Sequence, residues 1–287
     1  MKIRVPATSA NLGPGFDSCG IALSQYLTIE IGHETNQWQI EHQLGASIPS
    51  DQNNLLIKTA LELAPHLKPH YLTMTSDIPI ARGLGSSSSV VVAGIELANR
   101  LGNLGMTTER KVAYATKIEG HPDNVAPAIC GDFVVASYNE GRVNFVKHYF
   151  PECDVIAYIP DHELLTANSR AVLPTQMSYR DAVKASSIGN VMIAAILNGN
   201  LPLAGKMMER DILHEKYRLR LVPHLADIRK ICKVYGGYGS FLSGAGPTVL
   251  VLSAPEKTKK LVRALKGIDG KATIEVLSIE KEGVQIF

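Results

Sequence analysis

Residues 79–89 read Pro-Ile-Ala-Arg-Gly-Leu-Gly-Ser-Ser-Ser-Ser and stand between a strand-like segment and a helix-like segment. Gly83 and Gly85 lack side chains, so the backbone there can approach a ligand closely and take positive φ. The following helix begins among the serines, and its first amide groups lack helical partners and lie at the positive end of the dipole. Such a terminus suits phosphate, and the hydroxyls of Ser86–Ser89 can donate to phosphate or ligate magnesium. The stretch predicts a phosphate loop, with a serine-rich turn that only caps a helix as the alternative.

The loop differs from two common nucleotide-binding motifs. A Walker A loop needs GxxxxGK followed by Ser or Thr, and residues 79–89 contain no lysine. The spacing is also not the GxGxxG of dinucleotide-binding folds. A phosphate site at this position must therefore be of another kind.

Two further glycine-rich segments follow strand-like runs. Residues 8–17, Thr-Ser-Ala-Asn-Leu-Gly-Pro-Gly-Phe-Asp, combine small, polar and turn-forming residues. Within them Asn11 and Asp17 could hydrogen-bond a polar substrate. Residues 243–248, Ser-Gly-Ala-Gly-Pro-Thr, again permit close approach of a backbone. Each segment can also be an ordinary turn, so neither decides a function alone.

Residues 119–127, Glu-Gly-His-Pro-Asp-Asn-Val-Ala-Pro, concentrate acidic and histidine side chains after a helix-like run. Glu119 could bind Mg²⁺, which prefers oxygen ligands from one or two carboxylates plus phosphate. His121 and Asn124 could touch a substrate. A structural role is also open, because Asp123 or Asn124 would make a good helix N-cap. These residues form a site only if the glycine-rich loops meet them in space.

The bulk composition excludes several classes of protein. The chain has 287 residues, of which 45% are hydrophobic and 20% charged, as in an ordinary globular protein. The formal net charge is only +2, which argues against whole-protein attraction to nucleic acid or to an anionic membrane. The four cysteines form no CxxC pair, so reduced thiols are expected rather than a metal knuckle. With no signal-peptide-like start and no membrane-length apolar run, we expect a soluble cytoplasmic protein.

Strand-like and helix-like segments alternate along the whole chain, which indicates an α+β protein. We expect two domains that pack closely, 1–155 and 156–287, because no linker composition separates them. The expected strands are 3–5, 27–31, 71–75, 133–138, 155–159, 239–242, 248–252 and 273–277. The expected helices are 88–101, 108–118 with Thr107 as N-cap, 179–197, 203–209, 225–234 and 256–265.

Three glycine-rich loops in this order, with an acidic loop between the second and the third, resemble the GHMP kinase superfamily. Pro79–Ser89 matches its second, nucleotide-binding motif, and Ser243–Thr248 matches its third. Pro6–Asp17 and Glu119–Gly131 look like the versions found in the homoserine kinase branch. The resemblance spans the whole chain.

This resemblance implies a fold and a reaction. The fold would be the GHMP kinase fold, with a ribosomal-S5-like ATP-binding N-terminal domain and a ferredoxin-like C-terminal domain. The reaction would transfer the γ-phosphate of ATP to the hydroxyl of L-homoserine with Mg²⁺, giving O-phospho-L-homoserine in threonine biosynthesis. No nucleic-acid or membrane partner is implied, and a homodimer is expected because family members often dimerise.

The resemblance also assigns roles to single positions. Glu119 matches the magnesium-binding glutamate, and Ser87, with Ser88 as the alternative, would be the second magnesium contact. Asp17 would pair with the substrate ammonium, and Arg170 and Arg218 resemble arginines that hold the substrate carboxylate, which suits their bidentate fork. The substrate set is Asn11, Asp17, His121, Asn124, Arg170 and Arg218, and the catalytic set is Glu119, Asn124 and Arg170. The ATP-binding set is Pro79, Ile80, Ala81, Arg82, Gly83, Leu84, Gly85, Ser86, Ser87, Ser88, Ser89 and Asn54.

One position departs from the wider superfamily, because mevalonate kinase-like members carry an aspartate where this chain has Asn124. An amide cannot take the hydroxyl proton, so catalysis is expected to rest on positioning and charge neutralisation, which phosphoryl transfer permits. Two rival functions stay open. One is another GHMP kinase, such as a mevalonate-type kinase, and the other is a nucleotide-binding regulator, which would be expected to lose Glu119 or the phosphate loop.

Overall fold

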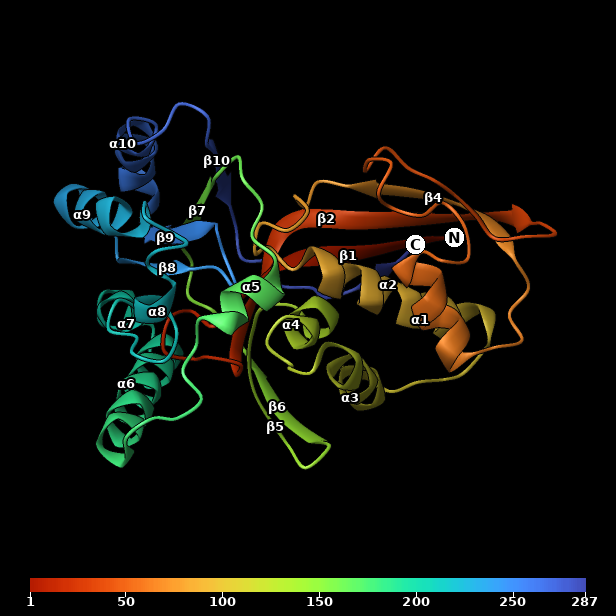
Figure 1. The fold of residues 1–287 in the computed structure, drawn as a ribbon, viewed down its shortest axis with the longest axis horizontal. Helices are drawn as coiled ribbons and strands as arrows, with labels where there is room; N and C mark the ends of the chain where they lie inside the picture. Colours follow the sequence, from red (N-terminus) through yellow and green to blue (C-terminus); the bar gives the residue numbers. More distant parts are fainter.

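Two β-sheets organise the chain, and the computed structural model describes all 287 residues (Figure 1). The seven-stranded sheet has the order β11-β1-β2-β4-β3, and β5 pairs with the start of β2 and with β6. Every pair is antiparallel except β3 with β4. Its strands are β1 Lys2–Ala10, β2 Cys19–Glu34, β3 Gln39–Glu41, β4 His70–Ser76, β5 Phe133–Asn139, β6 Arg142–His148 and β11 Gln285–Ile286.

Four helices lie along one side of this sheet in Figure 1: α1 Leu55–Leu63, α2 Ser86–Leu101, α3 Thr108–Glu119 and α4 Val125–Cys130. Helix α2 is the central one and has buried residues over most of its length, because it packs against β1 and the other three helices. This packing fixes the N-terminus of α2, and with it residues 79–89, at the edge of the domain that faces the second sheet.

The second sheet is four-stranded and antiparallel, in the order β10-β7-β9-β8. Its strands are β7 Asp154–Ile159, β8 Gly239–Leu242, β9 Val249–Ser253 and β10 Thr273–Leu277, and α9 Leu225–Tyr235 and α10 Pro255–Leu265 connect them. The ferredoxin-like arrangement is a strand, a helix, two strands, a helix and a strand, with the first and third strands at the centre of the sheet. The expected ferredoxin-like C-terminal domain is therefore confirmed. Helices α5 Thr166–Ala171, α6 Tyr179–Leu197, α7 Leu201–Met208 and α8 Glu215–Arg218 lie between β7 and α9 in the chain.

Strands β7, β8 and β9 of the second sheet are buried on both faces, as β7 shows. Val155 and Ala157 belong to the large core shared with the first sheet, whereas Ile156 and Tyr158 belong to a smaller core under α9 and α10. Because successive strand residues point to opposite faces, one strand serves two cores. The two domains consequently share one continuous hydrophobic interior.

The C-terminal residues return to the first sheet. Strand β11 pairs with β1, and Glu280 donates its backbone N–H to Ala22 O. The two termini therefore lie next to each other in Figure 1. The domain boundary proposed near residue 155 lies at the start of β7.

Most expected elements occur close to their expected bounds. Helix α2 begins at Ser86, two residues before the expected start, and Thr107 accepts a hydrogen bond from Arg110 N as the N-cap of α3. Seven elements were not predicted, because they are short or, like β6, mostly solvent-exposed: α1, α4, α5, α8, β3, β6 and β11. All four cysteines are free thiols. None of the helices has both the length and the apolar character needed to cross a membrane.

Candidate active site

The phosphate loop leads directly into α2 through Gly85, which is the helix N-cap in the left-handed region at φ 74°. Gly83 also has positive φ, and a Cβ there would lie 2.4 Å from Ser243 O. A Cβ on Gly85 would lie 2.1 Å from Thr8 Oγ1. Glycine is therefore required at both positions for two reasons, the positive φ of the backbone and the close approach of the neighbouring loops.

The three glycine-rich loops meet in space. Ser243 Oγ lies 2.6 Å from Gly83 O and 2.7 Å from Ser9 Oγ, so its hydroxyl joins the third loop to both others. Asn11 Nδ2 donates to Gly244 O at 3.1 Å, and Asn11 Oδ1 accepts from the backbone N–H of Asp17. The side chain of Asn11 thus holds the first loop in shape against the third.

A cavity of about 400 Å³ opens where the loops meet. Its wall contains most of the expected site residues: Asn11, Asp17, Asn54, Glu119, His121, Asn124, Arg170, Arg218, Ile80, Ala81, Arg82, Gly83, Gly85, Ser86, Ser87 and Ser88. Three expected nucleotide contacts, Pro79, Leu84 and Ser89, are not in the wall. Leu84 is fully buried in the core, and Ser89 Oγ bonds Ser86 O within the first turn of α2.

Two wall residues use their polar groups elsewhere. The Arg82 guanidinium donates to the carbonyl oxygens of Ile80, Pro160 and Asp161, so it ties the phosphate loop to the second domain. Asn54 accepts from Leu56 N as the N-cap of α1 and donates to Pro49 O. Their side chains shape the cavity wall, and only their remaining surfaces are available to a ligand.

Glu119, the last residue of α3, faces the start of α2. Ser87 Oγ donates to Glu119 Oε1 at 3.1 Å, and Ser88 Oγ donates to Oε2 at 3.3 Å. A carboxylate and two hydroxyls beside the N-terminus of α2 form an all-oxygen donor set, which fits a hard divalent cation.

Asn124 occupies the N-cap position of α4 but makes no capping hydrogen bond with its side chain. Its Oδ1 instead accepts from Thr8 Oγ1 at 2.9 Å. The capping role considered for Asn124 is therefore wrong, because Thr8 turns its amide away from α4. Nδ2 lies 3.5 Å from Asp123 Oδ1 and has a second N–H, which Asn124 can offer to a ligand as a donor.

A cluster of opposite charges also lines the cavity. Arg170 Nη2 and Nη1 donate to the two carboxylate oxygens of Asp17 at 2.6 and 3.1 Å, and this hydrogen bonding raises the pKa of Arg170. His121 Nδ1 lies 2.5 Å from Asp123 Oδ1. Burial by itself lowers the pKa of His121, but the hydrogen bond and the charge of Asp123 outweigh it and leave that pKa raised.

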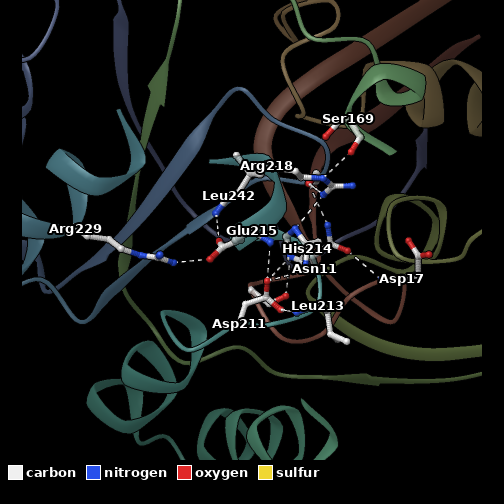
Figure 2. Close-up of polar contacts among 12 residues, drawn as sticks. Asn11, Asp17, Ser169, Asp211, Leu213, His214, Glu215, Arg218, Arg229 and Leu242 are labelled. Atoms are coloured by element: carbon white, nitrogen blue, oxygen red, sulfur yellow. Dashed lines mark hydrogen bonds and ion pairs between the residues drawn. The ribbon is translucent and has the colours of Figure 1, made fainter. Parts of the chain in front are cut away.

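Arg218 is almost fully buried, with 2% of its surface exposed, although it reaches the cavity wall. Its Nε donates to Ser169 O and its Nη1 to Gly244 O, while Nη2 has no protein partner (Figure 2). Burial lowers its pKa to about 10, and the charge of Arg170 acts in the same direction. Arg218 is therefore still a cation at neutral pH.

Four residues that contact the expected site residues were not predicted to belong to the site. Thr8, Phe16 and Asp123 lie inside the motifs quoted above, but the motifs indicated no ligand-binding role for them, and Asp123 was considered only as a helix N-cap. His214, which contacts Arg218, carried no local signal of its own, because it is an isolated histidine outside the glycine-rich and acidic motifs.

Comparison with known proteins finds the same family along the whole chain. The GHMP kinases N terminal domain matches residues 54–132, and the GHMP kinases C terminal domain matches residues 192–267. The homoserine kinase of Enterococcus faecalis is 64% identical over 287 residues, covering 100% of both chains. That of Listeria monocytogenes serovar 1/2a is 57% identical over the same length, again covering 100% of both. The crystal structure of homoserine kinase from Cytophaga hutchinsonii aligns with a TM-score of 0.87 at 26% identity, covering 100% of this chain and 97% of that one.

Proposed function

Because the chain belongs to the homoserine kinases of the GHMP kinase family, it transfers phosphate from ATP to homoserine, and we propose that the cavity between the two domains is where it does so. Neither a mevalonate-type kinase nor a regulator without activity fits this membership. The individual roles below are proposals that rest on the geometry of the cavity.

The observation that carries the proposal is the pairing of Asp17 with Arg170 at one side of the cavity. Homoserine is a zwitterion, so its ammonium and carboxylate carry the same two charges as this pair. Asp17 and Asp123 suit the ammonium. One ligand atom each of Asp17, Asp123 and His121 lies within 4.8 Å of the other two, so the two carboxylates are close together. Arg170 and the free Nη2 of Arg218 suit the carboxylate, because guanidinium groups bind carboxylates through several donors. Binding then exchanges one internal ion pair for two pairs with the substrate.

The opposite side of the cavity suits ATP. Apolar side chains there, Leu44, Ile48, Leu55, Met74 and Val90, form a wall on which an adenine ring can lie. The backbone of the phosphate loop and the first amides of α2 then face the phosphates, where unpaired N–H groups and the helix dipole stabilise negative charge. Glu119 with Ser87 would hold Mg²⁺, which supplies positive charge to the phosphates during transfer.

The chain's own residues contribute mainly by positioning. Asn124 donates from Nδ2 and has no basic group, and Thr8 keeps its amide in this orientation. We infer that the homoserine hydroxyl is aligned in this region and that its proton leaves to a phosphate oxygen rather than to a side-chain base. A largely dissociative phosphoryl transfer needs little help from a base, which makes such a mechanism sufficient.

The test is a coupled ADP-release assay with L-homoserine and with mevalonate as the alcohol. We expect rapid ADP release with homoserine and none above the background ATP hydrolysis with mevalonate, which lacks the ammonium. A rate with homoserine no higher than the background would overturn the proposal. A cytoplasmic location, a homodimer and the domain boundary near residue 155 stay predictions.

A further inference from the structure

The guanidinium of Arg218 is held by groups from three separate parts of the chain. Nε donates to Ser169 O at 3.1 Å, in α5, and Nη1 donates to Gly244 O at 3.1 Å, in the third glycine-rich loop. Nη1 also lies 2.9 Å from His214 Nδ1, directly before α8. His214 is the only side chain among the three contacts, so it is the one that the sequence can vary.

The partners of His214 determine its tautomer. Its Nε2 lies 2.9 Å from Gly13 O, which can only accept a hydrogen bond, so Nε2 carries the proton. Nδ1 then has a lone pair and accepts from the Arg218 guanidinium, which can only donate. Asp211 Oδ2 is 3.8 Å from Nε2, too far for a hydrogen bond. Both ring nitrogens are thus satisfied by one tautomer of a neutral ring.

The surroundings keep the ring neutral. His214 has no solvent-exposed surface, and burial lowers its pKa to about 4 although Asp211 acts in the opposite direction. The neighbouring charge of Arg218 lowers it further. A protonated ring would have no lone pair for Arg218 and would repel it, so the contact requires this neutral state.

Phe16 links the same histidine to both arginines of the substrate site. Its ring stacks on His214 with centroids 5.1 Å apart. The guanidinium carbons of Arg170 and Arg218 each lie 5.5 Å from the Phe16 centroid, within the range of cation–π attraction. The first glycine-rich loop therefore contacts the imidazole through Gly13 and through Phe16.

The backbone that carries His214 is itself anchored, as Figure 2 shows. Asp211 accepts hydrogen bonds from the backbone N–H groups of Leu213, His214 and Glu215. Glu215 in turn accepts from Leu242 N and pairs with Arg229. These contacts leave α8 little freedom, so the imidazole is a rigid support rather than a mobile side chain.

We propose that His214 is a positioning residue for substrate recognition, which orients Arg218 through Nδ1 and couples it to the first glycine-rich loop through Gly13. The proposal rests on the proposed function, because it assumes that Arg218 binds the homoserine carboxylate with Nη2. The support matters because Nη2 is the nitrogen that the protein leaves unpaired, and its direction depends on how Nε and Nη1 are held. Loss of the imidazole should therefore weaken homoserine binding and leave ATP binding unchanged.

Three variants separate the two bonds of the ring. In His214→Asn the amide oxygen takes the place of Nδ1 and can still accept from Arg218. In His214→Gln the amide nitrogen takes the place of Nε2 and can still donate to Gly13 O. His214→Ala removes both bonds. His224→Asn is the control, because His224 is likewise bonded to a backbone carbonyl, that of Pro247, but is only half-buried and does not contact either arginine.

The measurements are KM for homoserine, KM for ATP and kcat, with thermal unfolding as a check of folding. We expect KM for homoserine to rise about ten-fold or more in His214→Gln and His214→Ala, since a bond to a charged group is lost. We expect His214→Asn and His224→Asn to stay within about three-fold of the wild type, because both keep the acceptor for Arg218. KM for ATP should be the same in all five proteins.

The outcomes distinguish this proposal from the proposed function. If the wild type does not phosphorylate homoserine, the function itself fails. If the wild type is active but His214→Gln and His214→Ala keep its KM for homoserine, or if KM for ATP rises equally, the positioning role is refuted. Should the variants not fold, ¹⁵N imidazole spectra of the wild type decide. They should contain a histidine with a bare Nδ1 at pH 5.5 whose Nδ1 resonance shifts with homoserine and not with ATP, and no such resonance would refute the role.

Discussion

Replacing Asp17 with Asn tests the assignment of the ammonium site most directly. The amide has nearly the same shape as the carboxylate but carries no charge. In the structure, Asp17 forms a two-point pair with Arg170, and its side chain is 35% exposed. We propose that the substrate ammonium binds to the same carboxylate, so Asp17→Asn should weaken the binding of homoserine and not that of ATP.

The size of the effect follows from the distance and the exposure. Two unit charges about 4 Å apart interact by about 4 kcal/mol at an effective dielectric constant of 20. Partial exposure of Asp17 lets water screen this interaction, so about 2 kcal/mol is the more realistic loss, near the value for a hydrogen bond to a charged group. That loss corresponds to about 30-fold in kcat/KM for homoserine. Release of Arg170 from its internal partner offsets part of the loss.

The assay compares two alcohols in the wild type and the variant. Homoserine carries the ammonium, and 4-hydroxybutyrate is the same chain without it. Asp17→Asn should cost about 30-fold with homoserine and less than about three-fold with 4-hydroxybutyrate, while KM for ATP stays unchanged. Asp227→Asn serves as a matched control, because Asp227 pairs with Lys230 on the surface of α9. Equal losses with both alcohols would refute the pairing of Asp17 with the ammonium.

Four further perturbations address the rest of the site. Glu119→Gln keeps the shape but loses the charge beside the phosphates, so kcat should fall about 100-fold and a magnesium titration of ADP release should shift to higher concentration; an unchanged titration would argue against a metal ligand. Ser243→Ala removes the buried hydroxyl that joins the loops, so urea unfolding should show a loss of about 1–3 kcal/mol, with a raised KM for ATP. Gly83→Ala adds a clash with Ser243 O to the strain of positive φ and should weaken ATP binding at least about ten-fold, whereas Gly105→Ala, with positive φ in open space, should leave ATP binding unchanged. The pKa of His214 is 6.5 when the chain is unfolded but about 4 in the fold, so between these pH values the unfolded state binds more protons. The melting temperature should therefore fall as the pH is lowered from 6.5 to 4, and it should fall less steeply in His214→Asn.

The residues proposed to hold ATP and magnesium could be predicted from the sequence because they belong to local patterns. A glycine pair followed by serines specifies a turn and a helix start within a few residues, and the structure places both at the cavity. Glu119 and Asn124 likewise belong to one short loop. Pro79, Leu84 and Ser89 were included only because they belong to the same stretch, and neighbouring residues of a loop need not share one face.

The substrate side was harder to predict because its contacts join distant residues. Arg170 and Arg218 look equivalent as two arginines in polar segments, yet one forms an ion pair with Asp17 and the other is buried on backbone carbonyls. Asn11 was expected to contact the substrate; it lines the cavity, and its amide also holds two loops together, which no local pattern indicated. Which hydrogen-bond partner each side chain finds depends on the packing of the two domains.

By itself, the sequence determined the family, and it predicted the phosphate loop and the metal ligand, because all three depend on short motifs whose backbone geometry is encoded locally. Only the tertiary structure decided which charged groups pair within the protein and which keep a free donor or acceptor for a ligand. His214 illustrates the reason: its ring contacts Gly13, 201 positions away in the chain, and its charge state follows from burial that no local pattern encodes. A phosphate loop can be recognised from consecutive residues, whereas the orientation of a buried arginine depends on residues from several separate segments.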